Sequence, residues 1–262
     1  MSDLSAKSFI SNLFRLIAAK PAIPPSLEGN THLKTILERR SVRKFKPDPI
    51  GPDHWAAILE AGRVAPSTVN LQTWSFAEFT APQWRDFFGQ PLPFDAQRGL
   101  VILADTHRMN RAVPELPRAP ICEYTIGVMN ASLAAMNMTC AAEALGIASV
   151  MLSETGRTGF YDAAHLKAKL ELPDGVVPIM SLVFGWPSVG AQAMPPKLPL
   201  EAVTFTGKYR ETPAETLESW YDQMQAGYLV SQKGQSFESK IKYYARRIDE
   251  AERDLRNMVL PK

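Results

Sequence analysis

Glu38-Arg39-Arg40-Ser41-Val42-Arg43-Lys44-Phe45 is the stretch of sequence around which the fold is organised. Its basic and hydroxyl side chains can bind an anion, whereas Val42 and Phe45 can anchor the segment in a core. Guanidinium groups hold phosphates and planar carbonyl edges through paired donors, so this cluster suits a flat, phosphorylated ligand. A run of solvated charges explains the same residues as well. A second polar stretch, residues 65–74, shifts the balance towards ligand binding.

The composition predicts a globular protein with one main domain and extensions. The chain has 262 residues, of which 45% are hydrophobic, and this is long and apolar enough to bury a core. Its formal net charge of +2, without a long run of one sign, favours neither nucleic acid nor an anionic membrane as a partner. No apolar run approaches the roughly 18 residues that span a bilayer, and no signal-peptide cleavage pattern follows the first helix.

The cysteine and histidine residues indicate whether disulfide bonds or a metal site are to be expected. Two cysteines, Cys122 and Cys140, do not suggest a disulfide framework and fit a reducing compartment, so we predict a cytoplasmic location. The four histidines show no metal-ligand spacing, and we expect no metal site. The sequence has neither GxGxxG nor GxxxxGK[ST], so it predicts no dinucleotide fold or phosphate loop of those types.

Hydrophobic periodicity predicts strands separated by helices of unequal length, which is an α+β pattern. A helix capped by Asn30 or Thr31 leads into the arginine cluster, and Pro52 opens the next helix. A long helix at 123–145, apolar on nearly every side, belongs at the centre of the fold or at a subunit interface. The predicted strands are 74–79, 99–105, 147–152 and 176–184, and a shorter helix lies near 162–170.

Residues 82–120 are the least regular part of the sequence, apart from the strand at 99–105. Long excursions of this kind often cover a site, so we consider an aromatic lid. Plain packing accounts for the aromatic residues equally well. The candidate lid residues are Trp84, Phe87, Phe88 and Phe94, and the arginines available to an anionic substrate or coenzyme phosphate are Arg108, Arg111 and Arg118.

Both ends of the chain carry predicted helices with an apolar face that must be shielded from water. The apolar face of the N-terminal helix, residues 4–20, suits a partner subunit, with a membrane surface as the rival. From Phe237 to Met258, apolar residues recur at steps of four and three, which predicts packing along the N-terminal arm or a second subunit. We therefore divide the chain into an N-terminal helical arm (1–29), a central domain (30–205) and a C-terminal helical extension (206–262).

Several motifs in order resemble the nitroreductase family of FMN-dependent flavoproteins. The first two are Arg39-Arg40-Ser41-Val42-Arg43 and Ala65-Pro66-Ser67-x-x-Asn70-x-Gln72-x-Trp74. The others are Ala144-Leu145-Gly146-Ile147, Gly159-Phe160, Leu172-Pro173-Asp174-Gly175, Val183-Phe184-Gly185-Trp186-Pro187 and Pro196-Lys197-x-Pro199-Leu200. The resemblance covers residues 33–205. It implies an α+β fold with an antiparallel or mixed central sheet flanked by helices, in an interlocked homodimer with two FMN sites at the subunit interface.

The resemblance also implies a set of cofactor-binding residues. The flavin phosphate, ribityl chain and pyrimidine edge would be held by Arg39, Arg40, Ser41 and Arg43. The isoalloxazine would be flanked, from the other subunit, by Pro66, Ser67 and Asn70, with Gln72 in the same motif. Lys197 would bind the phosphate, and the reactive edge would be approached by Leu152, Ser153 and Glu154.

The function that the resemblance implies is hydride transfer by FMN. NADH or NADPH would reduce the flavin, which would then reduce a nitroaromatic, a quinone or another small electron-poor acceptor in a ping-pong cycle. Because the cofactor carries the chemistry, we expect no catalytic side chain. Two other interpretations stay open. One is a flavin-binding module that senses, stores or delivers FMN without turnover, and the other is a helical adaptor that acts through the terminal helices.

Overall fold

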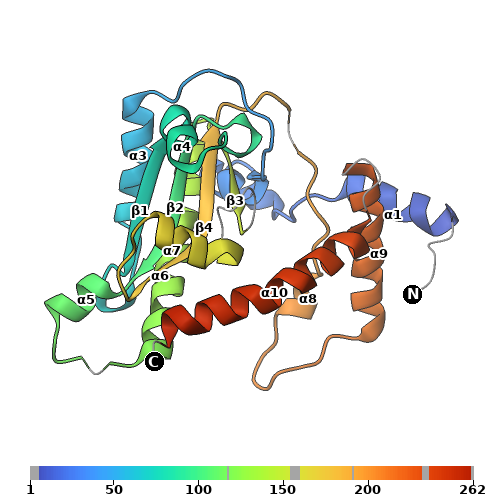
Figure 1. Cartoon of the computed structure of the whole chain (residues 1–262). Coiled ribbons are helices and arrows are strands. Elements are labelled where there is room, and N and C mark those ends of the chain that lie inside the picture. Colours follow the sequence, from blue (N-terminus) through green and yellow to red (C-terminus); the bar gives the residue numbers. More distant parts are fainter. Residues whose placement is uncertain (1–5, 117, 154–159, 191, 232–235, 261–262) are drawn as a thin grey trace. The chain divides into compact units, whose positions relative to one another are not determined.

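A computed structural model describes residues 6–116, 118–153, 160–190, 192–231 and 236–260 (Figure 1). The chain forms two compact units, and each unit is assembled from segments that are distant in sequence. The smaller unit consists of Met1–Pro24 and Ala193–Arg246, and the larger of Pro25–Gln192 and Arg247–Lys262. The predicted division at residues 29 and 205 stays a prediction.

A four-stranded antiparallel sheet forms the centre of the larger unit. Its strands are β1 (Trp74–Thr80), β2 (Arg98–Asp105), β3 (Ala148–Leu152) and β4 (Val176–Gly185), in the order β1-β2-β4-β3. The register pairs Trp74 with Ala104, Arg98 with Phe184, and Ala148 with Gly185. The predicted α+β fold with a central antiparallel sheet is confirmed, and each predicted strand end lies within about one residue of the observed one.

Helices cover both faces of this sheet (Figure 1). On β2, Leu100 and Ile102 face the core formed with α3 (Pro52–Arg63) and α6 (Pro120–Ala144). Val101 and Leu103 face the opposite core, formed with α4 (Ala81–Phe88) and α7 (Ala163–Lys169). Successive side chains of a strand point to opposite faces, so burial on both sides explains why β2 is an unbroken apolar run.

The helices begin at the capping signals that the sequence carries. Asn30 caps α2 (Thr31–Glu38), because its Oδ1 accepts from the Leu33 N–H at 2.9 Å. Proline occupies the first turn of α3 and of α6. Two helices, α4 and α5 (His107–Ala112), lie in the excursion that was predicted to be irregular, so that prediction is wrong there. Single 3-10 turns are η1 (Pro25–Leu27), η2 (Thr68–Asn70), η3 (Pro93–Asp95) and η4 (Phe160–Asp162).

The smaller unit is helical among its described residues. It contains α1 (Ala6–Ala18), α8 (Leu200–Val203), α9 (Ala214–Ser231) and the first part of α10 (Phe237–Val259). The N-terminal helix α1 packs against α9, which the sequence analysis did not predict. The start of α10 also packs on α9, with the ring of Phe237 5.6 Å from those of Tyr221 and Tyr228. Among the described residues, no helix combines the length and apolar character needed to cross a bilayer.

Candidate functional site

The arginine segment that follows α2 runs along the outer edge of the sheet. Ser41 bridges Ser149 of β3 in a parallel manner, and the Val42 N–H donates to the Ser149 carbonyl at 3.1 Å. Phe45 bridges Pro187 and lies directly over Gly185, where a side chain would clash with its ring. Two backbone bridges and one aromatic anchor therefore fix the segment to β3 and to the end of β4, as expected for Val42 and Phe45.

The guanidinium groups of this segment differ in their environment. Arg40 Nη1 donates to the carbonyls of Leu37 and Arg39, both at 2.8 Å, and so satisfies the end of α2. The Nε atoms of Arg39 and Arg40 are buried, and neither has a hydrogen-bond partner among the described residues. Arg43 is exposed. Buried donors without a partner are rare in proteins, and a bound anion is one way to satisfy them.

The end of α6 supplies a counter-charge to these arginines. Burial raises the pKa of the Glu143 carboxyl above its ordinary value, against the opposing effect of the Arg39 and Arg40 charges. Burial likewise raises the pKa of the Cys140 thiol, again against Arg39. The two arginines therefore lie close to the last turns of α6, near a carboxylate that the sequence analysis did not single out.

The loop at 65–73 is fastened to the middle of α6 by one buried side chain. Asn130 Oδ1 accepts from the Thr68 N–H at 3.1 Å, and its Nδ2 donates to Thr73 Oγ1 at 2.8 Å. Within the loop, the Gln72 N–H donates to Ser67 Oγ at 3.1 Å. Asn130 thus holds both ends of the loop, and Ser67 closes its interior.

Backbone strain is concentrated in this loop. Val69, Asn70 and Gln72 all have positive φ angles, of 49°, 56° and 49°. The left-handed conformation is costly for a β-branched residue such as valine, and it persists only where surrounding contacts impose it. The Val69 side chain is nevertheless 86% exposed, so its own packing does not compensate for the strain. Strained, exposed backbone of this kind is typical of binding sites.

The loop and the arginine segment are attached to opposite halves of α6. Asn130 and Glu143, the two attachment points, are thirteen residues apart on this helix. At about 1.5 Å of rise per residue, thirteen residues correspond to about 20 Å. In a single copy of the chain, the attachment points of the two predicted halves of the site are therefore about 20 Å apart along α6.

Residues 36–90, which contain both the arginine segment and the loop, match a family model described as the Nitroreductase family. The NADPH-flavin oxidoreductase of Vibrio harveyi is 29% identical over 205 residues, covering 76% of this chain and 83% of that protein. The FMN reductase (NAD(P)H) of Bacillus subtilis (strain 168) is 28% identical over 213 residues, with coverages of 76% and 83%. Nitroreductase A from Vibrio parahaemolyticus superposes with a TM-score of 0.68 at 25% identity, over 83% of this chain and 91% of that structure. Residues 36–90 of this chain are therefore similar to the nitroreductase family.

The other predicted cofactor residues lie in three places. Leu152 is buried at the end of β3, and Ser153 follows it with a carbonyl that accepts from the Tyr161 N–H at 3.3 Å. Pro66 is exposed at the start of the loop. Lys197 is exposed in the smaller unit. Glu154 lies outside the described residues.

The aromatic residues of the predicted lid pack in a core of the larger unit. Trp84 is completely buried, and its ring lies 4.3 Å from that of Phe88 and 5.4 Å from that of Phe79. Phe94 packs partly buried against the same core. These side chains form the core beside α4, because α4 turns their apolar face towards the sheet. Plain packing, the alternative to a lid, therefore accounts for them.

Of the three arginines in that excursion, Arg111 is exposed, and Arg108 and Arg118 form ion pairs with the protein. Arg108 pairs with Asp105 at 3.3 Å and also donates to the Trp74 carbonyl, although its side chain is 61% exposed. Arg118 Nε donates to the buried carboxylate of Glu123 at 3.1 Å. Both contacts tie the excursion to the sheet and to α6. They leave no observation that favours coenzyme binding by Arg108.

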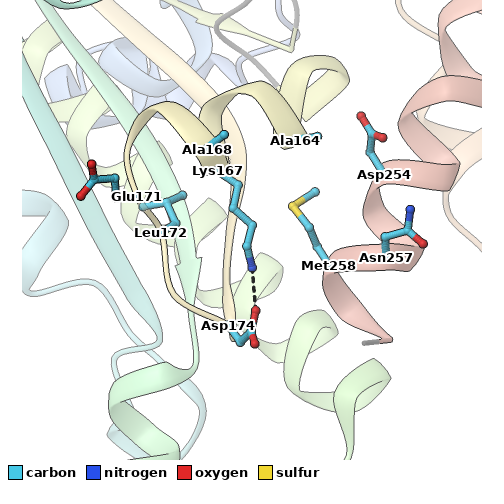
Figure 2. Close-up of a pocket in the computed structure, with 9 residues that line it drawn as sticks. All are labelled: Ala164, Lys167, Ala168, Glu171, Leu172, Asp174, Asp254, Asn257 and Met258. Atoms are coloured by element: carbon cyan, nitrogen blue, oxygen red, sulfur yellow. Dashed lines mark hydrogen bonds and ion pairs between the residues drawn. The ribbon is translucent and has the colours of Figure 1, made fainter. Parts of the chain in front are cut away.

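One hollow of the larger unit is lined by none of the predicted cofactor residues. It measures about 650 Å³ and is lined by Ala164, Lys167, Ala168, Glu171, Leu172, Asp174, Asp254, Asn257 and Met258. Figure 2 shows these residues on α7, the following turn and the end of α10, with an ion pair of 2.9 Å between Lys167 and Asp174. The hollow is open and mixed in charge, and none of the predicted cofactor residues lines it.

Two residues that interact with the predicted cofactor segments were not singled out by the sequence analysis. Asn130 is a polar residue in the middle of an almost wholly apolar helix, and this contrast was a usable signal. Glu143 gave no such signal, because a glutamate near a helix end is usually solvated. Only the packing of α2 against α6 brings it to the arginines.

Proposed function

We propose that the protein is an NAD(P)H-dependent FMN oxidoreductase, which reduces small electron-poor acceptors such as nitroaromatics and quinones. The observation that carries this proposal is the pair of buried, unpartnered guanidinium Nε atoms of Arg39 and Arg40, in a segment fixed to the sheet edge. Relatives named NADPH-flavin oxidoreductase and FMN reductase support the choice of donor and cofactor. A structural relative named nitroreductase A supports a nitro compound as acceptor.

The residues present fit a flavin mononucleotide. Arg39, Arg40 and Arg43 bring three cations to one segment, and Ser41 adds a hydroxyl, which suits a phosphate and the carbonyl edge of a flavin. The exposed, strained loop with Ser67 and Asn70 presents polar groups without bulk. When bound, FMN would supply the hydride chemistry. The chain would bind it, exclude water and stabilise negative charge near the arginines.

We further propose that the enzyme is a homodimer with its sites between subunits. The loop and the arginines are attached about 20 Å apart on α6, so a second copy is the simplest means of placing both at one flavin. Exposed apolar side chains on the same helix, Ile121, Met129 and Leu133, support this arrangement. Two free cysteines agree with the cytoplasm as its location.

The visible spectrum of the purified protein is the first test. We expect a yellow protein whose flavin is bleached by NADH or NADPH without oxygen and restored by a quinone. A protein that stays colourless after incubation with FMN would refute the proposal. Bound flavin that neither coenzyme reduces would favour the module that stores or delivers FMN.

The position of the site is tested by arginine variants. We expect Arg43→Ala to lower FMN retention strongly, because it removes an exposed guanidinium from the segment proposed to bind FMN. Arg108→Ala should lower it less, since Arg108 is tied to Asp105. Arg63→Ala, which removes an exposed ion pair with Glu60, is the neutral control. Equal FMN content in all three variants would show that the site is elsewhere.

A further inference from the structure

The second half of α10 is fastened to the segment that follows β3. Arg247 of α10 donates from Nη2 to the Tyr161 carbonyl and to Asp162 Oδ1, both at 2.9 Å. Tyr161 in turn donates its own N–H to the Ser153 carbonyl at 3.3 Å. Ser153 directly follows Leu152, the last residue of β3. A path of hydrogen bonds therefore joins Arg247 to the end of that strand.

The Arg247–Asp162 ion pair is sheltered from water. The Asp162 side chain is 4% exposed and the Arg247 side chain 25%. A carboxylate this deeply buried needs its cation, because desolvation of a lone charge is costly. Arg247 Nε also lies 3.3 Å from Glu250 on the same helix, which limits the rotation of the guanidinium. The pair is thus a fixed contact, unlike the exposed ion pairs elsewhere on α10.

Apolar contacts hold the end of α10 in the same unit. Met258 is buried with Ala163 and Val177, and Tyr124 packs beside them. Figure 2 shows Met258 and Asn257 of α10 on the opposite side of the hollow from α7. The helix is therefore held at two places eleven residues apart, by the ion pair and by the methionine.

We propose that Arg247 is a positioning residue of the flavin site, and that α10 acts as a brace for the end of β3. The proposal rests on the proposed function, since Leu152 and Ser153 belong to that site. Arg247 touches neither cofactor nor substrate and acts through Tyr161 and Ser153. A binding site keeps its geometry only where supporting contacts hold the residues that line it. Without Arg247, the Tyr161 backbone is released and Ser153 loses its fixed partner.

The test compares Arg247→Ala and Arg247→Lys with Arg256→Ala in the full-length protein. Arg256 lies on the same helix in an exposed ion pair with Glu252, so its loss controls for the removal of a charge from α10. We expect Arg247→Ala to bind FMN about tenfold more weakly in titrations of the flavin-free protein. Arg247→Lys should recover most of the affinity, and Arg256→Ala should match the wild type. The visible circular dichroism of bound FMN should change with Arg247→Ala alone.

A second readout and a second variant keep the proposal open to refutation. Hydrogen exchange at the Tyr161 amide of the flavin-free protein should accelerate in Arg247→Ala. The double variant Asp162→Asn/Arg247→Met leaves no unpaired buried charge, so it should fold, yet still bind FMN about tenfold more weakly.

The outcomes separate this proposal from the proposed function. Failure of the wild type to take up FMN would overturn both, and the Tyr161 exchange would then report the Arg247 linkage alone. A wild type that binds FMN, with unchanged affinity in Arg247→Ala and in the double variant, would overturn the brace and leave the oxidoreductase standing.

Discussion

Asn130 illustrates how a single side chain can set the shape of a loop. It is 1% exposed, and its amide accepts from Thr68 and donates to Thr73, at the two ends of the strained turn. A buried polar group stabilises a fold only while its partners are present, and it also fixes a particular geometry. The left-handed backbone at Val69 and Asn70 is therefore a consequence of this contact.

We expect Asn130→Ala to lower the free energy of unfolding by about 2 kcal/mol, since it removes the donor to the buried Thr73 hydroxyl and the acceptor of the Thr68 N–H. It should also lower FMN affinity, because the loop loses its tether. Asn137, on the same helix as Asn130, donates to the Ala61 carbonyl of α3 in a partly buried contact, so Asn137→Ala is the matched control and should affect stability alone. Urea denaturation and FMN titration measure the two effects. Unchanged FMN affinity in Asn130→Ala would contradict this role.

The Glu123 carboxyl makes the stability of the folded protein depend on pH. Burial works to raise its pKa, yet hydrogen bonds from Asn110, the Ala119 N–H and Arg118 hold that pKa below the ordinary value of a glutamate. A depressed pKa in the folded state means that the stabilisation is present above the unfolded pKa, about 4.3, and is lost as pH falls through the folded pKa.

Glu123→Gln should therefore unfold at a lower temperature than the wild type at neutral pH. The difference should shrink as the pH falls below about 4.3, and it should vanish below the lower folded-state pKa of Glu123, where the wild-type carboxyl is also neutral. Thermal unfolding followed by circular dichroism across this range measures it. A constant difference at all pH values would mean that the Glu123 charge does not matter.

At the scale of elements, the packing of α3 on α6 depends on a missing side chain. Gly62 of α3 lies where a Cβ would come within 2.0 Å of the Met138 Cε and 2.9 Å of its Cγ. Met138 is completely buried, so it has little room to move. The two helices can approach this closely because residue 62 is glycine.

Gly62→Ala should consequently destabilise the protein by about 1–2 kcal/mol, although alanine is the better helix former. Gly29→Ala, where a Cβ meets nothing within 4 Å, should leave the melting temperature nearly unchanged. Differential scanning calorimetry compares the two variants with the wild type. A higher melting temperature for Gly62→Ala would show that the helices separate freely.

The sequence allowed the sheet to be predicted because each strand is an apolar run of the expected length between clear breaks. It did not allow α4 to be recognised, since its aromatic residues suggested a lid, although Thr80 and Gln83 form a capping box at its start. The positive φ of Val69 could not be predicted, because valine disfavours it and a residue 61 positions away imposes it. The arginines were predicted by chemical type, and Glu143 was not, since tertiary packing alone brings it to them.

At the scale of the whole molecule, one face of α6 exposes large apolar side chains that a partner subunit could cover. Ile121, Met129 and Leu133 are 63%, 54% and 44% exposed, and their spacing of four or eight residues places them along one side of the helix. We expect Leu133→Glu to convert a dimer into a monomer and to abolish FMN retention, because a buried charge without a partner is unfavourable at an interface. Leu133→Met keeps the surface apolar and should behave as the wild type. Light scattering after size-exclusion chromatography measures the molar mass of each variant. A Leu133→Glu variant that stays dimeric would show that the interface does not include this face of α6.

The interleaving of the two units along the chain has a consequence for synthesis in the cell. Residues 25–192 leave the ribosome long before residues 247–262, yet both belong to the larger unit, and the smaller unit is divided in the same way. The two units therefore cannot fold completely one after the other as the chain is synthesised. The larger unit of the nascent chain therefore keeps an incomplete surface until residues 247–262 of α10 have emerged.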